Sequence, residues 1–120
     1  MTQGRHAKEA PLFVQSMALA RWLFENLRGP GVLVERIQRD ALRLLDEIVL
    51  ALKDVDRDES LARADTTAAL LRVHLRLGQE LGAVDERQLV FLTGELDAVG
   101  RQIGGWQRRL AQDRLGERHR

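Results

Sequence analysis

The stretch that decides the fold is residues 84–110, VDERQLVFLTGELDAVGRQIGGWQRRL. Its large apolar residues follow one another at steps of three and four positions, which is the spacing of one face of an α-helix. These residues are Leu89, Leu92, Leu96, Val99, Ile103, Trp106 and Leu110. Just before them, Gly82 has the place of a helix C-cap, and Asp85 with Gln88 three residues later has the pattern of a capping box. The sequence therefore predicts a helix over 85–112 that buries one regular seam of side chains.

Three segments upstream show the same periodicity, and they predict helices over 11–28, 31–55 and 60–82. The residues expected to face the core are Phe13, Met17, Ala20, Phe24 and Leu27 in the first; Leu33, Ile37, Ala41, Leu44, Ile48, Ala51 and Val55 in the second; and Leu61, Ala64, Ala68, Leu71, Leu75 and Gly78 in the third. The third segment also carries a second apolar lane, and two lanes predict two buried contacts. That lane consists of Leu70, Val73, Leu77 and Leu81.

Proline, glycine and polar residues mark the expected helix ends. Pro11 suits the first turn of a helix, where its missing N–H costs nothing. Gly29 accepts the left-handed conformation that ends many helices. The polar run 54–60 separates the second helix from the third, and a short oxygen-bearing side chain in it is expected to cap the third helix. The candidates are Asp56, Asp58 and Ser60.

Four helices joined by short loops predict an all-α, up-down-up-down antiparallel four-helix bundle. The composition agrees, since the 120 residues include 21 Leu and 13 Ala against 9 Val, 3 Ile and 4 Thr, and there is no tyrosine. We expect residues 1–9 to be a flexible N-terminus, 10–112 to form the bundle and 113–120 to form a basic C-terminal tail.

Several classes of protein are disfavoured by the same composition. The absence of cysteine excludes a disulfide scaffold, a thiolate metal site and a cysteine nucleophile. Charged residues recur every few positions, so no stretch approaches the roughly 20 apolar residues that span a bilayer. The N-terminal residues lack the apolar core of a signal peptide. We therefore expect a soluble, cytoplasmic protein with no membrane partner.

The sequence shows no arrangement typical of a catalytic site. Ferritin-like bundles take Glu-x-x-His pairs from their helices to bind metals, and no such pair is present. His74 stands alone in the third segment and is expected at the boundary or surface of the bundle rather than in a metal site. Ser16 and Ser60 are the only serines, and neither belongs to a legible triad. We expect a non-enzymatic protein with no cofactor, no metal and no small-molecule substrate.

Positive charge is concentrated at one end of the chain. Residues 101–120 hold six arginines against Asp113 and Glu117, a local charge of +4, which leaves −3 for residues 1–100 out of a total of +1. Arg72 and Arg76 are one helical turn apart and project together. Guanidinium groups placed in this way suit the binding of phosphates, although a solvated helix face has the same pattern.

Three glycines in the fourth predicted helix need a physical reason. Gly100, Gly104 and Gly105 each cost roughly 1 kcal/mol relative to alanine inside a helix. Close approach of a neighbouring helix or subunit to this smooth surface, with Trp106 packed in the seam, compensates for that cost. A kink or fraying near the helix end is the alternative.

The segments also resemble a known family of four-helix-bundle proteins, that of the ribosomal-RNA intervening sequences and the accessory variability determinants. The resemblance covers about residues 10–110, and Gly-Arg-x-x-Gly-Gly-Trp is its most specific element. The matching segments are Pro11–Val14, Arg36–Ile37, Ala41–Glu47, Leu71–Leu77 and Val99–Trp106.

This resemblance implies a homopentameric barrel around a central channel. It further implies an accessory protein of a diversity-generating retroelement, which binds a reverse transcriptase and RNA or DNA during mutagenic copying. The basic residues at matching positions are Arg36, Arg63, Arg72, Arg76 and Arg101, and Arg108 and Arg109 are added because of the local charge. Family members outside retroelements leave a second possibility open, a scaffold with protein partners only.

Overall fold

A computed structural model describes residues 3–118 of the chain, and the side chains of residues 11–117. This part of the chain contains four α-helices and no strand. The helices are α1 (Gln3–Asn26), α2 (Gly31–Leu52), α3 (Arg57–Glu80) and α4 (Glu86–Arg118). The expected all-α class and the four-helix architecture are confirmed.

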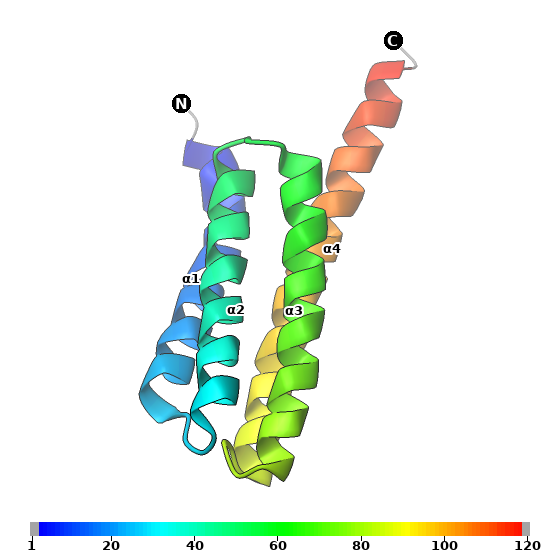
Figure 1. Ribbon diagram of the computed structural model, residues 1–120. Coiled ribbons are helices and arrows are strands. Elements are labelled where there is room, and N and C mark those ends of the chain that lie inside the picture. The colour runs from blue at the N-terminus through cyan, green and yellow to red at the C-terminus, as the bar shows by residue number, and fades with distance from the viewer. Residues whose placement is uncertain (1–2, 119–120) are drawn as a thin grey trace.

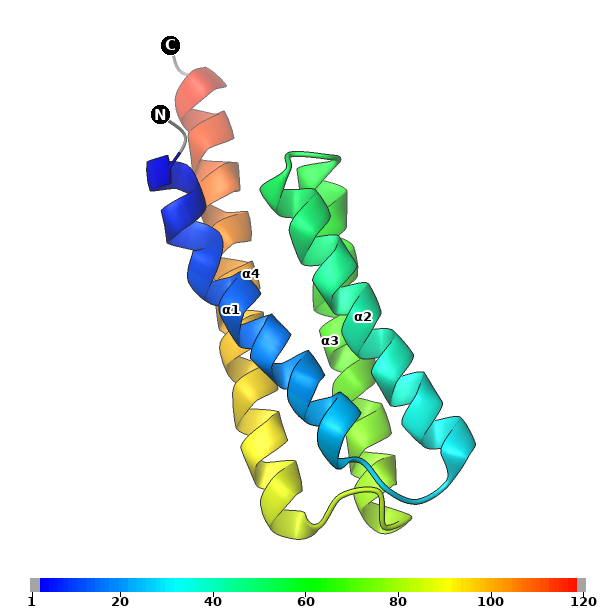
Figure 2. The same ribbon diagram turned by 90° about the vertical axis from the view of Figure 1, so that its left-hand side faces the viewer.

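The four helices run alternately up and down, and each packs against the next in the chain (Figure 1). The contact between α2 and α3 is the most extensive, and α1 also meets α4, which closes the bundle (Figure 2). The molecule measures 55 × 25 × 22 Å. Its length is due to α4, whose C-terminal part projects past the loop that joins α2 to α3 (Figure 1). A bundle only two helices thick has one core and leaves half of every helix outside it.

The seams expected for three of the four helices form the core. In α3, every residue of the expected seam from Leu61 to Gly78 is buried. In α4, the buried residues run from Leu92 to Trp106 at steps of three and four. In α2, the residues from Ile37 to Ala51 that were expected inside are buried as well. Val55, also expected inside, follows the end of α2 and is 47% exposed. The periodicity of three and four therefore located the core of α2, α3 and α4.

The face predicted for α1 is wrong in part. Ala20 is buried, and Phe13 and Leu27 pack partly buried against the core, but two of the predicted residues are not inside. Met17 and Phe24 were expected inside, but they are 41% and 48% exposed. The buried residues of α1 instead include Leu12, Leu19 and Leu23. Both stripes have helical spacing, and they lie about 100° apart around the helix because they are offset by one residue. Contact with α2 and α4 together, rather than periodicity, decides which stripe is buried.

The second apolar lane of α3 also differs from expectation, because it is not buried within the chain. Val73 is 62% exposed, Leu81 52%, Leu77 43% and Leu70 36%. None of these four side chains is buried by another helix of the described chain, although Leu70 and Leu77 are more than half covered. A protein in water that leaves such a lane open on one helix has apolar surface available for another molecule.

The two loops at one end of the bundle have the predicted conformations. Gly29 and Gly82 have φ of +88° and +84°, the left-handed region that glycine enters without strain. The capping box is present, since the backbone N–H of Gln88 donates to Asp85 Oδ1 at 2.7 Å and that of Asp85 donates to Gln88 Oε1 at 2.9 Å. These contacts end α3 and begin α4 as expected.

The predicted cap of α3 is wrong. Asp56 occupies the N-cap position with φ of 43°, and its side chain makes no capping hydrogen bond. The left-handed backbone there differs from the extended backbone that side-chain capping needs. The hydroxyl of Ser60 donates to the carbonyl of Val55 at 2.9 Å, and Asp58 pairs with Arg114. None of the three candidates, Asp56, Asp58 or Ser60, caps the helix.

Both outer ends of the bundle are more helical than expected. α1 begins at Gln3, within the segment expected to be flexible, so Pro11 lies inside the helix and not in its first turn. α4 continues to Arg118, so most of the expected tail is helical. Within that extension, Arg114 bonds to α3, which holds the helix against its neighbour. Residues 1–2 and 119–120 of the two expected termini lie outside the described residues.

Two polar pairs join α2 to α3 inside an otherwise apolar interface. Thr67 Oγ1 donates to Glu47 Oε1 at 2.8 Å, and His74 Nδ1 lies 2.8 Å from Oδ2 of the buried Asp40. His74 thus lies at the boundary of the bundle, as predicted. Burial raises the pKa of Glu47, against the opposing effects of the Thr67 hydrogen bond and of Arg43. Ionised Glu47 therefore destabilises the fold at neutral pH, and this cost decreases as the pH falls through its raised pKa.

Ser16 is buried on the core face of α1, at 1% exposure, and its hydroxyl has no hydrogen-bond partner. Burying a hydroxyl without a partner costs about 1–3 kcal/mol, because its hydrogen bonds to water are lost on folding. Neither a histidine nor another base bonds to this hydroxyl in the described residues, which leaves Ser16 without the activation that a nucleophile requires.

The Ser16→Ala variant is expected to raise the free energy of unfolding by about 1 kcal/mol, because it removes an unsatisfied hydroxyl and adds helix propensity. Chemical denaturation measures this change. Ser60→Ala is the matched control, since its hydroxyl is bonded, and it is expected to lower the free energy of unfolding by a similar amount. A loss of stability in Ser16→Ala would contradict the assignment.

Candidate nucleic-acid interface

Two ion pairs cross from α3 to α4 on the outside of the bundle. Arg72 Nη2 lies 2.5 Å from Asp97 Oδ1, and Arg114 Nη2 lies 2.6 Å from Asp58 Oδ1. All four side chains are between 45% and 63% exposed. Because α3 and α4 are antiparallel, the Arg114–Asp58 pair lies where α3 begins and α4 ends, and the Arg72–Asp97 pair lies near the middle of both helices. The two pairs belong to one surface that runs along both helices. Exposed pairs such as these contribute at most about 1 kcal/mol each, so they orient the guanidinium groups more than they stabilise the fold.

Three more arginines extend this surface. Arg76 is one turn beyond Arg72 on α3, and Arg101 is one turn beyond Asp97 on α4, so they lie on opposite sides of that ion pair. Arg108 is about two turns further along α4. All three are exposed and form no ion pair with another described residue. The α3/α4 arginine face is defined here as Arg72, Arg76, Arg101, Arg108 and Arg114.

The arginine face has a modest positive charge. Its acidic residues are Asp58, Asp65 and Asp97, which leaves +2 for five arginines and three aspartates. Asp58 and Asp97 are already paired with arginines. Asp65, two turns before Arg72 on the same side of α3, has no partner among the described residues. The face is therefore suited to weak binding of polyanions. Stronger binding requires several copies of the face to act on one polyanion.

The structure does not bring the other predicted arginines to this face. Arg36 bonds to the buried Asp40 at 3.3 Å, on the side of α2 that faces α3. Arg63 pairs with Glu59 at 2.9 Å, also towards α2. Arg109 follows Arg108, and one residue of helix turns it about 100° away. Of the seven predicted binding residues, four lie together and three do not.

The glycines of α4 are not covered by another helix of the chain. A Cβ at Gly100 would meet no atom within 4 Å in the described residues. At Gly104 and Gly105 it would meet only the guanidinium nitrogens of Arg108 and Arg109, at 3.4 Å or more. Of the two alternatives, a neighbouring helix of the described chain therefore does not pack on these glycines. Their contact with a second copy stays a prediction.

Trp106 is buried in the core, as predicted, at 5% exposure. Arg57, which sequence reasoning missed, lies over its ring, with the guanidinium carbon 5.4 Å from the ring centroid. Arg57 also donates from Nε to the carbonyl of Ala51 at 2.7 Å. This arginine fastens the loop between α2 and α3 to α4. Its position inside the polar run 54–60 was the only sequence signal for it.

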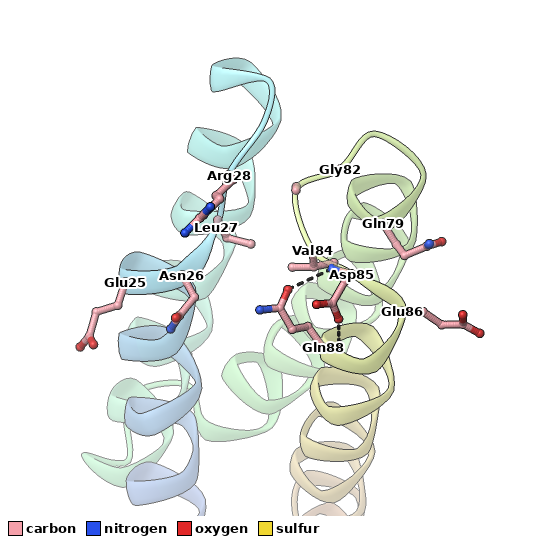
Figure 3. Close-up of a pocket in the computed structure, with 11 residues that line it drawn as sticks. Glu25, Asn26, Leu27, Arg28, Gln79, Gly82, Val84, Asp85, Glu86 and Gln88 are labelled. Carbon is pink, nitrogen blue, oxygen red and sulfur yellow. Dashed lines mark hydrogen bonds between the residues drawn. The ribbon is translucent and has the colours of Figure 1, made fainter.

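A pocket of about 560 Å³ lies at the end of the bundle where the two tight loops meet, between the end of α1 and the start of α4 (Figure 3). The side chains of Glu25 and Glu86 point away from this space (Figure 3). Asp85 and Gln88 bond to each other's backbone and are occupied as a helix cap. The polar groups of this pocket thus mainly serve the helix ends.

None of the helices within residues 3–118 has an apolar stretch that would reach across a bilayer. In the same part of the chain, no three histidine or acidic side chains are grouped as metal ligands would be. Comparison with models of protein families, with curated proteins and with solved structures found no match for this chain.

Gly100→Ala is expected to raise the free energy of unfolding by about 1 kcal/mol, since the site is helical and a methyl group meets open space. If a second copy contacts this glycine, the same variant also lowers the mass of the assembly measured by light scattering. Gly94→Ala, equally open on α4, is the control for helix propensity alone. An unchanged mass for Gly100→Ala would contradict a role of Gly100 in subunit packing.

Proposed function

We propose that this chain is a non-enzymatic accessory protein that assembles as a homopentamer, binds RNA or DNA through the α3/α4 arginine face and binds a reverse transcriptase. The observation that carries the proposal is the division of its outer surface. Exposed apolar side chains form patches on α1, α2 and one side of α3, whereas the arginine face lies over the other side of α3 and α4. Val90, Phe91 and Leu115 of α4 are exposed as well, outside these patches. One side is thus suited to assembly and the other to polyanions.

Eight of the exposed large apolar side chains form two different patches. One is the α3 apolar lane, Leu70, Val73, Leu77 and Leu81. The other, the α1/α2 apolar face, consists of Met17, Phe24, Leu42 and Val49, which are between 38% and 49% exposed.

The contacts of neighbouring residues place the second patch. On α2, the carboxylates of Asp40 and Glu47 face α3. Leu42 lies two residues after Asp40, and Val49 lies two residues after Glu47, so both side chains point about 200° away from α3. On α1, Gln15 bonds to Gln102 of α4, and Trp22 packs on Phe91 of α4. Met17 lies two residues after Gln15, and Phe24 lies two residues after Trp22. The patch therefore covers the outside of the α1 and α2 pair.

Two unlike apolar patches on one chain support a ring. When the α3 apolar lane of one copy packs on the α1/α2 apolar face of the next, the contact is heterologous, and its repetition closes into a ring or continues as a filament. The family resemblance favours closure with five copies. A ring also repeats the arginine face, so that the weak charge of +2 of each face acts several times on one polyanion.

The retroelement role and the polymerase partner come from the resemblance. In this role the protein holds a reverse transcriptase and nucleic acid together while a template repeat is copied into a target gene. A neighbouring reverse-transcriptase gene with a pair of near-identical repeats would support this role directly.

A scaffold with protein partners only is the second candidate. The observation that favours it is that Arg72 and Arg114 are already paired with Asp97 and Asp58. A nucleic acid has to compete with these carboxylates for two of the five arginines. This candidate predicts an intact assembly without salt-sensitive binding of nucleic acid.

The assembly is tested by light scattering after gel filtration, where the native chain is expected at about five times its mass of 13.6 kDa. Val73→Arg together with Leu77→Arg is expected to give a folded monomer, because two charges cannot be buried unpaired in the contact. Val90→Arg, at a site on α4 that is 68% exposed, is the control and should leave the mass unchanged. A native monomer would refute the ring.

Binding of nucleic acid is tested by fluorescence anisotropy in a salt series. The affinity is expected to fall steeply as salt increases, and Arg72→Glu with Arg76→Glu should lower the steepness of this dependence by about 2 in log–log slope. Arg21→Glu with Arg28→Glu makes the same change of charge away from the face and should have a smaller effect. No detectable binding at low salt would leave only the scaffold.

A further inference from the structure

The arginine face has no aromatic side chain on which a base could stack. The chain has five aromatic residues, and α3 holds none of them. On α4, Phe91 is 49% exposed but lies on the side of the helix that meets Trp22 of α1, with ring centroids 6.1 Å apart. Trp106 is buried under Arg57. Proteins that bind single strands without sequence preference obtain about 1–3 kcal/mol per base from aromatic stacking. This contribution is missing here.

The shape of the face also limits what it can contact. It is formed by two antiparallel helices side by side, each about 10 Å across, so it is about 20 Å wide. The major groove of B-form DNA is about 12 Å wide and admits a single helix. Guanidinium groups on a two-helix face therefore meet phosphates at the edges of a groove and not the bases inside it.

The arginines form a row of fixed length. From Arg76 past the Arg72–Asp97 pair to Arg108 the row spans about 22 Å at 1.5 Å per residue. The cross-helix ion pairs use only part of the five N–H donors of each guanidinium, and the side chains of Arg72 and Arg114 remain 45% and 58% exposed. A duplex presents phosphates along such a row without being ordered first, because it is stiff over about 150 base pairs. A flexible single strand has to lose conformational freedom to follow the row.

From these three observations we infer that the α3/α4 arginine face binds double-stranded nucleic acid through its phosphates, independently of sequence and in preference to single strands. This inference rests on the proposed function and specifies its substrate. Three arginines contact the phosphates without first breaking an ion pair within the described residues, namely Arg76, Arg101 and Arg108. Two more, Arg72 and Arg114, add further phosphate contacts. Asp65 opposes binding, because its carboxylate lies among these arginines without a partner.

The test measures binding of the full chain to a duplex RNA of about 20 base pairs, a duplex DNA and the single strands of each, all of one sequence, at several salt concentrations. Both duplexes are expected to bind at least tenfold more tightly than the single strands and within a few-fold of each other. Asp65→Asn is expected to tighten duplex binding about twofold. Arg101→Gln with Arg108→Gln should weaken it and reduce the log–log salt slope by about 2, whereas Arg21→Gln should change neither quantity.

The alternative outcomes separate the two proposals. Single strands bound as tightly as duplexes would overturn the inference and leave the proposed binding of nucleic acid intact. Recognition of only one of the two duplexes would refute contact through phosphates alone. A duplex preference that survives Arg101→Gln with Arg108→Gln unchanged would place the contact elsewhere and overturn the inference as well. No binding to any of the probes would refute both this inference and the nucleic-acid part of the proposed function.

Discussion

Burial of one seam per helix is the constraint on which the rest of the structure depends. In a bundle only two helices thick, each helix has one side that faces the other three, and leucine, isoleucine and alanine side chains fill it. Full burial of a leucine-sized side chain is worth about 1.5–3 kcal/mol, so the core outweighs all the exposed ion pairs together. Every other apolar or basic residue is consequently left on the outside, and it is this remainder that is available for partners.

Polar contacts between helices then set how the seams align. Thr67 with Glu47 and His74 with Asp40 fix the position of α3 along α2. A buried carboxylate that loses its partner is costly, so sliding α3 by one turn is unfavourable. Two ion pairs connect α3 to α4 in the same way, Arg72 with Asp97 and Arg114 with Asp58. They also hold the arginines in one row. The alignment of the bundle and the layout of the arginine face thus have a common origin.

Periodicity predicted most of the fold because α2, α3 and α4 each have one dominant seam. It failed for α1, where the stripe through Met17 and Phe24 is as regular as the buried stripe through Leu12 and Leu19. It also failed for the α3 apolar lane, because a sequence shows that residues share a face but not whether another helix covers it. The candidate site was predicted in part for the same reason. Arg72 and Arg76 share a turn, but their grouping with Arg101 and Arg108 depends on the packing of α4.

The sequence by itself determined that the chain is helical, where its loops lie and which seams of α2, α3 and α4 are buried. These properties depend on residues within a few positions of one another, through the helical repeat and the chemistry of Gly29, Gly82 and the Asp85–Gln88 box. Only the tertiary structure decided the rotation of α1, the exposure of the α3 apolar lane and the gathering of five arginines on one face. These depend on pairs such as Arg72 and Asp97, 25 residues apart, whose contact the local pattern does not encode.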